Sequence, residues 1–415
     1  MRLLVISQYF WPENFRINEL VAELIKRGYQ VTVLTGVPNY PDGQVFKDFR
    51  DAPFDFAYYA GANVIRVPMA VRGQSAVRLM LNYLTFALSA STVGLWKLRG
   101  QQFDAIFAYE PSPVTVGLPA AALRRVKKAP LAFWVLDLWP ETLLALNIVR
   151  TPVLLAIVGK LVGFIYRRCD LILAQSKSFI PQIRKYAGKR QQVVYFPNWA
   201  EPASAIDQSI TPPDVPSKLG SFSVMFAGNV GEAQDFPTIL AASEILKPYT
   251  DIRWLIVGDG RMASWVSEEI KRRGLEGCFL MLGRHPAEQM PAFFKHADAL
   301  LVSLKKDAIF SMTIPGKLQS YLAAGKPIIA ALDGEGAELV RSSCSGLTSP
   351  AGDAVGLAAV VLQLFELTAL ERDQMGQNGR KIGSSDFDRD RLIDTLDKNL
   401  RRMQIEVLGH GLTSW

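Results

Sequence analysis

A lysine that follows a proline–glycine pair is the side chain best suited to bind a phosphate group. Pro315 and Gly316 end a loop, and Lys317 then opens a stretch whose apolar residues recur at helical spacing until Gly325. Backbone N–H groups at residues 316–318 would have no partner inside this helix, and the helix dipole and the lysine both favour an anion there. A diphosphate would fit this position. The alternative is an ordinary capped helix with a solvated lysine.

Three glycine-containing loops could complete a nucleotide site. Each follows an apolar run that we expect to form a strand: Gly228-Asn229-Val230-Gly231, Gly258-Asp259-Gly260 and Gly283-Arg284-His285. Loops at the carboxyl ends of parallel strands face a common ligand crevice, and glycine lets the backbone approach a phosphate or a base closely. The sequence lacks the glycine fingerprint of NAD-binding domains, which disfavours a nicotinamide cofactor. The loops and the Lys317 helix together predict a nucleotide that carries a diphosphate.

Composition excludes several other classes of protein. At 415 residues the chain is longer than one hydrophobic core usually serves, and 49% hydrophobic with 20% charged residues indicates a folded protein of two domains. The three cysteines are widely and irregularly spaced, which favours a reducing compartment. None of the three histidines has a second histidine or a cysteine nearby in the sequence, so neither a zinc site nor a Ser/His/Asp hydrolase is expected.

The net charge of +7 permits attraction to anionic lipid, an anionic substrate or nucleic acid. Nucleic acid is the least favoured of these partners, because the aromatic residues are not interleaved with the basic ones. The apolar run after Met1-Arg2 is too short for a signal peptide and is typical of a first strand. We therefore expect a cytoplasmic protein.

Short apolar runs alternate with helical patterns through both halves of the chain. The runs are Leu3–Ser7, Val31–Thr35, Val64–Val67, Ala105–Tyr109, Leu131–Leu136, Leu171–Ala174 and Val193–Phe196 in the first half, and Phe222–Ala227, Trp254–Val257, Phe279–Leu282 and Leu300–Ser303 in the second. This alternation predicts parallel sheets covered on both faces. A Pro- and Ser-containing linker at 201–220 would separate a first domain, 1–200, from a second, 221–385. The expected fold class is α/β, with two doubly wound, Rossmann-like domains that face a central cleft.

Two apolar helical segments could contact a membrane. The segment Leu79–Trp96 carries no charge over 18 residues, which meets the lower length limit for a membrane-spanning helix. Spanning would place strands of one sheet on opposite sides of the bilayer, so we expect a helix that is buried or lies in the membrane surface. Thr151–Arg168, with basic residues at its end, is a second candidate for surface attachment. Two core-facing helices are the alternative.

Five motifs resemble the retaining glycosyltransferases of family 4, and the resemblance covers nearly the whole chain. The motifs are Gln8-Tyr-Phe-Trp-Pro-Glu-Asn-Phe-Arg-Ile-Asn18, Pro38-Asn-Tyr-Pro41, Asp137-Leu-Trp-Pro-Glu141, Gly228-Asn-Val-Gly-Glu-Ala-Gln-Asp235 and Lys317-Leu-Gln-Ser-Tyr-Leu-Ala-Ala-Gly-Lys-Pro327. Within the family they are most similar to the WbuB-type N-acetyl-L-fucosaminyl transferases of O-antigen and capsule assembly. The resemblance implies a GT-B fold, a UDP-sugar donor and a lipid-linked saccharide acceptor. It also implies a last helix, in 386–415, that crosses back to the first domain.

The chain departs from the family pattern at its donor site. The usual Arg and Lys of the first loop of the second domain fall on Asn229 and Gln234, and the usual glutamate pair falls on Met312 and Ser320. Charge balance for the diphosphate must then come from Lys317, its helix N-terminus and Arg284 or Arg16. The expected donor-binding residues are Gly228, Asn229, Gln234, Gly258, Arg284, Gly316, Lys317 and Ser320.

In the first half, Asp137 matches the acid of the family's His-Asp segment, with Leu136 in place of the histidine. A carboxylate at the end of a strand could accept the proton of the acceptor hydroxyl, although an Asp that only caps the next helix is an equal alternative. Glu110 also follows a strand and ranks second. Catalytic roles are therefore expected for Asp137, Glu110 and Lys317. The motifs place acceptor binding at Asn14, Arg16, Asn39 and Tyr40.

The run Asp386-Phe-Asp-Arg-Asp390 superficially resembles the metal-binding acidic triplet of the other major glycosyltransferase fold. It precedes apolar residues at helical spacing, so we expect its acids to complement a helix dipole. No metal and no cofactor are expected.

The leading hypothesis is a glycosyltransferase on the inner face of the cytoplasmic membrane. It would move an N-acetylated deoxyhexose, L-FucNAc in the closest motif match, from UDP to a polyprenyl-diphosphate-linked sugar with retention of configuration. The alternatives are a UDP-sugar 2-epimerase and a non-catalytic sugar-nucleotide-binding scaffold.

Overall fold

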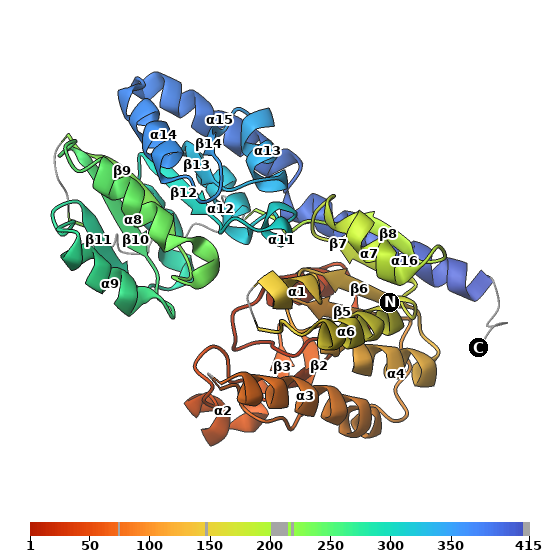
Figure 1. Cartoon of the computed structure of the whole chain (residues 1–415). Coiled ribbons are helices and arrows are strands. Elements are labelled where there is room, and N and C mark those ends of the chain that lie inside the picture. Colours follow the sequence, from red (N-terminus) through yellow and green to blue (C-terminus); the bar gives the residue numbers. More distant parts are fainter. Residues whose placement is uncertain (74, 146–147, 201–214, 217–219, 410–415) are drawn as a thin grey trace. The chain divides into compact units, whose positions relative to one another are not determined.

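The computed structural model describes residues 1–73, 75–145, 148–200, 215–216 and 220–409. Two compact units make up the chain (Figure 1). The first comprises Met1–Phe196 and Leu392–Trp415, and the second comprises Pro197–Arg391. Most of the predicted linker, 201–220, lies outside the described residues.

The first unit contains an eight-stranded sheet in the order β3-β4-β2-β1-β5-β6-β7-β8. All neighbouring strands are parallel except β3 and β4. The strands are β1 (Arg2–Ile6), β2 (Gln30–Gly36), β3 (Tyr58–Tyr59), β4 (Ala62–Val67), β5 (Ala105–Glu110), β6 (Leu131–Val135), β7 (Leu171–Ala174) and β8 (Gln192–Tyr195). The central strands are apolar on both sides because helices cover both faces, as expected for a parallel sheet.

Helices connect these strands. They are α1 (Arg16–Lys26), α2 (Lys47–Asp51), α3 (Ala76–Lys97), α4 (Gly117–Lys127), α5 (Glu141–Ala145), α6 (Pro152–Tyr166) and α7 (Phe179–Ala187), with the 3₁₀ turns η1 (Pro53–Phe56) and η2 (Val114–Val116). Helix α3 packs against α4, α4 against α6 and α6 against α7, so these four form one helical layer. The last helix, α16 (Arg389–Gly409), also packs on this unit, where Arg27 binds Asp394 and Tyr29 donates to Asp397.

The second unit contains a six-stranded parallel sheet in the order β11-β10-β9-β12-β13-β14. Its strands are β9 (Phe222–Ala227), β10 (Ile252–Val257), β11 (Phe279–Gly283), β12 (Ala299–Ser303), β13 (Ile328–Ala331) and β14 (Gly346–Ser349). Its helices are α8 (Phe236–Ile245), α9 (Ala263–Arg272), α10 (Met290–Phe294), α11 (Ala308–Ser311), α12 (Gly316–Ala324), α13 (Glu335–Ser342), α14 (Ala354–Glu366) and α15 (Ala369–Ser385), with the 3₁₀ turns η4 (Glu232–Gln234) and η5 (Ala287–Gln289). Both units are doubly wound, as predicted.

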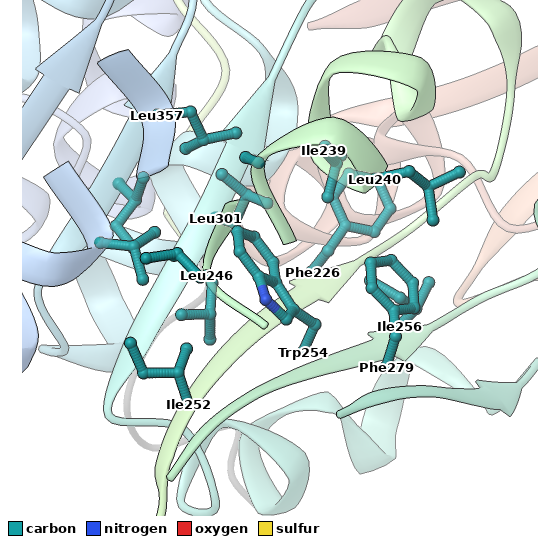
Figure 2. Packing of buried hydrophobic residues seen from close by; sticks show 14 of the residues in the cluster. Phe226, Ile239, Leu240, Leu246, Ile252, Trp254, Ile256, Phe279, Leu301 and Leu357 are labelled. Carbon is teal, nitrogen blue, oxygen red and sulfur yellow. The ribbon is translucent and has the colours of Figure 1, made fainter. Parts of the chain in front are cut away.

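Aromatic and branched side chains fill the core on one face of the second sheet (Figure 2). Trp254 of β10 lies between side chains of α8 and neighbouring strands, with the Phe279 ring stacked 6.2 Å from it between centroids. On the adjacent strand, the Phe226 ring packs edge-on against Phe236 at the start of α8. This packing fixes β9, and with it the loop that begins at Gly228.

Helix α3 is the uncharged segment singled out in the sequence. Among the described helices, Val77–Lys97 is the one that by itself is long and apolar enough to cross a membrane. One face is buried against the sheet through Asn82, Tyr83, Phe86, Ala87 and Ala90. Strand β4 before it and β5 after it both belong to the eight-stranded sheet, which supports the topological argument against spanning.

Candidate active site

Lys317 lies in the first turn of α12, at the carboxyl edge of the second sheet. Its Nζ atom is buried, makes no hydrogen bond with any described residue, and lies 3.6 Å from the centroid of the Phe226 ring. Burial lowers the pKa of Lys317 to about 7. A buried amine without an acceptor is costly, because it has lost its hydration and gained no hydrogen bond in return. The arrangement is therefore poised to bind an anion.

Two of the predicted glycines form the surroundings of this amine. A Cβ atom on Gly228 would lie 3.3 Å from Lys317 Nζ, so glycine lets the loop backbone lie close to the buried amine. A Cβ atom on Gly258 would fall 1.8 Å from the Gly228 carbonyl oxygen, so the two loops pack backbone to backbone. Both glycines have positive φ, of 137° and 148°, which side chains rarely tolerate. Of the three loops predicted to surround the Lys317 helix, the Gly228 loop lies at the amine and the Gly258 loop packs on the Gly228 loop.

The other predicted donor-binding residues lie in the loop after β9, after β11 and in α12. Asn229 and Gln234 belong to the loop after β9, where Gln234 Oε1 accepts from the Gly231 N–H at 3.2 Å. The Asn229 side chain is exposed there. Arg284 is exposed after β11, and Ser320 is part-buried one turn after Lys317 in α12. Neither side chain makes a hydrogen bond or ion pair with a described residue. The structure thus brings Gly228, Gly258 and Lys317 together, with Gly316 next to Lys317 in the chain, and Arg284 follows Gly283, whose carbonyl accepts from the Gly258 N–H at 2.7 Å.

The first unit holds two carboxylates at neighbouring strand ends. Glu110 is the last residue of β5 and lies opposite Val135 on the neighbouring strand β6. Asp137 follows Val135 by two positions. The Asp137 N–H donates to Glu110 Oε2 at 3.4 Å, whereas Glu110 Oε1 is buried and has no hydrogen-bond partner among the described residues. Burial raises the pKa of the Glu110 carboxyl well above its usual value, and the Asp137 charge adds to this. Glu110 is fully buried, so its proton is not available at the surface.

Asp137 is held by two side-chain donors. Its Oδ1 accepts from the Thr142 hydroxyl at 2.5 Å, and its Oδ2 accepts from the Trp139 indole N–H at 3.1 Å. Burial raises the pKa of Asp137, although these hydrogen bonds oppose the rise. Thr142 lies in α5, so Asp137 contacts the start of the next helix through a side chain, and both of these hydrogen bonds come from side chains, not from the backbone N–H groups that a helix cap would bind. The residue is part-buried, and a carboxylate with a raised pKa could accept a proton from a hydroxyl group.

Glu13 connects the two motifs that were expected to bind the acceptor. Its Oε1 accepts from the Asn39 and Tyr40 N–H groups at 2.8 and 2.7 Å, and its Oε2 accepts from the Phe10 N–H at 3.0 Å. Burial raises the pKa of Glu13 to about 7 despite these three donors. The Asn39 side chain is fully buried and bonds to Val37 and Arg72 backbone atoms, so it shapes this loop.

A polar network beside this loop joins the segment after β1 to α3. Tyr9 donates to Asn82 Oδ1 at 2.9 Å and accepts from Arg72 at 3.2 Å, and the Arg72 guanidinium lies over the Tyr40 ring. Asn14 is exposed, whereas Arg16 pairs with Glu19 at 3.1 Å. The exposed Asn14 and the part-buried Arg16 and Tyr40 are thus the predicted acceptor residues with side chains that a ligand could reach.

Sequence reasoning missed Glu13, Arg72 and Asn82. Glu13 stood inside a quoted motif, but its backbone partners follow more than 25 residues later and have no side-chain signature. Asn82 could have been found, because a polar residue on the buried face of an apolar helix needs a hydrogen-bond partner, which here is Tyr9.

The acidic run 386–390 serves helix capping. Asp388 Oδ1 accepts from the Arg391 N–H at 2.8 Å at the start of α16, as a helix N-cap does. No group of three metal-ligating side chains is found among the described residues.

Comparison with known proteins gives matches over both units. A model described as "Glycosyl transferase 4-like domain" matches residues 14–199, and one described as "Glycosyl transferases group 1" matches residues 221–366. The chain is similar to "Probable glycosyltransferase WbjE" of Pseudomonas aeruginosa, with 26% identity over 56% of this chain and 60% of that protein. It is 25% identical to "Putative colanic acid biosynthesis glycosyl transferase WcaI" of Escherichia coli over 78% of this chain and 82% of that one.

Solved structures share the architecture of the whole chain. The Anabaena protein Alr3699/HepE, crystallised in complex with UDP and glucose, has a TM-score of 0.68 with 16% identity and covers 97% of this chain and 100% of its own. WaaG, a protein of lipopolysaccharide biosynthesis, gives a TM-score of 0.66 with 12% identity over 96% of this chain and 99% of its own. At these identities the likeness concerns the fold.

Proposed function

Because the chain belongs to the group 1 and family-4-like glycosyltransferases of the GT-B fold, we propose that it transfers a sugar from a UDP-sugar to a polyprenyl-diphosphate-linked saccharide. The transferred sugar is an N-acetylated deoxyhexose, L-FucNAc by resemblance to the WbuB-type enzymes, and its configuration is retained. The product would enter a bacterial surface polysaccharide such as O-antigen or capsule. Relatives named for colanic acid and amylovoran biosynthesis support this assignment.

The buried amine of Lys317 carries the donor part of the proposal. It has no hydrogen-bond acceptor among the described residues, and it stands beside a helix N-terminus and the Gly228 loop. Diphosphate oxygens would give the amine its missing acceptors and would meet the free N–H groups of the first turn. A GT-B structure crystallised with UDP gives independent support for this ligand.

The reaction exchanges one bond at the anomeric carbon for another. The bond from this carbon to the diphosphate oxygen breaks, and UDP leaves with negative charge that Lys317 and the α12 amides stabilise. The acceptor hydroxyl oxygen forms the new bond on the same face of the sugar, and its proton passes to Asp137. Thr142 and Trp139 orient this carboxylate. Glu110, which is fully buried, would support the Asp137 backbone rather than meet substrate.

The donor site would work without a metal ion. Lys317 and the α12 N-terminus supply positive charge in this region, and Asp388 of the acidic run is engaged in capping α16. Arg284 is exposed and could move toward a bound donor.

The first unit would bind the membrane through its helical layer. Helix α3 exposes Val77, Leu88 and Trp96, with exposed fractions of 70%, 67% and 62%, and carries the exposed basic residues Arg78 and Lys97. Exposed apolar side chains flanked by cations are typical of helices that lie in a membrane surface. These side chains support the proposal that the enzyme lies on the inner face of the cytoplasmic membrane.

Release of UDP tests the function against its two alternatives. The purified protein is given UDP-L-FucNAc with and without a polyprenyl-diphosphate-linked saccharide, and both UDP and the sugar are analysed. A transferase releases UDP when the acceptor is present. Conversion of the sugar to its 2-epimer without acceptor would instead identify an epimerase, and binding without any conversion would identify a scaffold.

A further inference from the structure

A groove between α6 and α7 lies in the same helical layer of the first unit. It has a volume of about 500 Å³ and is lined by Leu155, Gly159, Lys160, Arg167, Lys185 and Tyr186, among others. Three of these side chains are cationic, and all three residues are exposed. Gly159 lets the Tyr186 ring approach α6 closely, because a Cβ atom there would lie 3.2 Å from the ring, and Gly163 leaves room for the Arg167 guanidinium in the same way.

We propose that this groove binds the diphosphate of a polyprenyl-linked acceptor at the membrane surface. The proposal rests on the proposed function for the identity of the lipid. Lys160 makes no hydrogen bond or ion pair with any described residue, so its charge is available to a ligand. Arg167 donates to the Tyr186 carbonyl at 3.3 Å, and Lys185 donates to Gln182, so neither is paired with a carboxylate there. Three cations in one groove match a diphosphate better than a single phosphodiester charge.

The spacing along α6 indicates that the phosphate belongs to a lipid. Residues 153, 157, 160, 164 and 167 follow each other at intervals of four and three, so they form one stripe along the helix. Val153, Ile157 and Phe164 of this stripe are 67%, 56% and 39% exposed. Lys160 and Arg167 belong both to this apolar stripe and to the groove. Side chains of this kind bury apolar stems and place their charges at the level of lipid headgroups.

The groove also connects to Asp137 through one short segment. Pro140 lines the groove, and the next residue, Glu141, accepts from the Tyr186 hydroxyl at 3.0 Å. Thr142, one residue further, donates to Asp137. The Tyr186 hydroxyl fixes the position of the Glu141 side chain, whose other oxygen, Oε2, is buried and has no hydrogen-bond partner among the described residues. A diphosphate bound by the three cations would therefore lie beside the segment that orients the proposed base.

Binding to vesicles without any donor sugar tests the proposal. Phosphatidylcholine vesicles carry either a small fraction of a long-chain polyprenyl diphosphate or phosphatidylglycerol at the same surface charge. The full-length protein should prefer the diphosphate vesicles. The triple variant Lys160→Gln, Arg167→Gln, Lys185→Gln should bind them roughly 10- to 100-fold more weakly, since each basic residue near the surface contributes to attraction.

A matched control removes the same charge outside the groove. Arg184, Lys189 and Arg190 are exposed in and after α7 and do not line the groove, so their triple Gln variant should keep the preference for diphosphate. Equal loss in both variants would reduce the effect to net charge and overturn the proposal. Equal binding of wild type to both vesicle types would show a surface for bulk anionic lipid and would also overturn it. The vesicle assay contains no donor sugar, so its result does not depend on sugar transfer. A protein that binds the diphosphate vesicles but releases no UDP in the transfer assay would refute the proposed function and leave the groove proposal standing.

Discussion

The amine of Lys317 lies 3.6 Å from the centroid of the Phe226 ring. The same ring packs edge-on against Phe236, the first residue of α8. The ring gives the charge a weak cation–π interaction and at the same time excludes water from it. Phe226 is the residue of β9 that precedes Ala227 and Gly228, so one strand supplies both the cover of the amine and the loop beside it. The Lys317 amine thus has no hydrogen-bond acceptor among the described residues, and a bound anion would supply one.

Replacement of Lys317 by Ala should weaken UDP binding by about 1.5–3 kcal/mol, the range for a hydrogen bond to a charged group. Isothermal calorimetry measures the change. Lys271→Ala, at an exposed lysine in α9 of the same unit, is the control and should bind UDP normally. Unchanged affinity in a folded Lys317→Ala protein would remove this residue from the donor site.

Binding of UDP should take up a proton above pH 7. The pKa of Lys317 in the free protein is about 7, and a bound diphosphate favours the charged amine and raises that pKa. Above pH 7 the free amine is mostly neutral, so affinity should fall as pH rises, by up to about tenfold per unit until the pKa of the complex is reached. Titrations in buffers of different ionisation enthalpy, at about pH 7.5 and above where UDP itself is fully ionised, would detect the uptake. A Lys317→Met protein that shows the same pH dependence would assign it elsewhere.

The variant Asp137→Asn should lower transfer at least ~100-fold while UDP binding stays unchanged, because an amide cannot accept the proton. Radiolabelled transfer to the lipid-linked acceptor gives the rate. Thr142→Val is the companion variant. Loss of its hydrogen bond should raise the pKa of Asp137 further, so the rising limb of the pH–rate profile should move to higher pH. Near wild-type transfer by Asp137→Asn would remove the base role from Asp137 and leave it as a residue that orients Trp139 and Thr142 at the start of α5.

Membrane binding should be reversible by salt. Attraction between the basic residues and anionic lipid is screened over ~10 Å at 0.1 M salt. Sedimentation with anionic liposomes at increasing salt measures the release. If the protein stays in the membrane pellet after high-salt and alkaline washing, α3 is inserted across the bilayer and the argument from β4 and β5 fails.

Transfer should continue after exhaustive chelation, because Lys317 and a helix N-terminus supply the positive charge. The variant Asp388→Ala should be less stable by about 1 kcal/mol, as expected for a lost N-cap, and should remain active. Thermal unfolding and the transfer assay check the two parts. Activity that disappears with chelator, returns with Mg²⁺ or Mn²⁺ and is lost in Asp388→Ala would overturn the metal-free donor site.

The sheets were predictable because buried parallel strands appear as short apolar runs. Predicted strands such as Phe222–Ala227 and Leu171–Ala174 have the observed bounds. Strands β3 and β14 were not predicted, since Tyr58–Tyr59 has two residues and Gly346–Ser349 contains one apolar side chain among small and polar ones.

The candidate site was predictable where local chemistry determines it. Lys317 was identified because a Pro-Gly pair and a helical pattern stand next to each other in the sequence. The burial of its amine could not be foreseen, because the Phe226 ring comes from a strand 91 positions earlier. The role of Glu13 was equally hidden, because its partners are backbone groups of a distant loop.

The return of α16 to the first unit makes that unit discontinuous in sequence. Residues 197–391 form an insertion between two pieces of one folding unit, so the first piece completes its packing only after the second unit has been synthesised. A fragment that ends at Phe196 would leave Arg27 and Tyr29 without Asp394 and Asp397. To obtain the first unit alone, residues 1–196 would have to be joined to 392–415 by a short artificial linker, and a protein cut before α16 would be prone to aggregate through the bared face of the first unit.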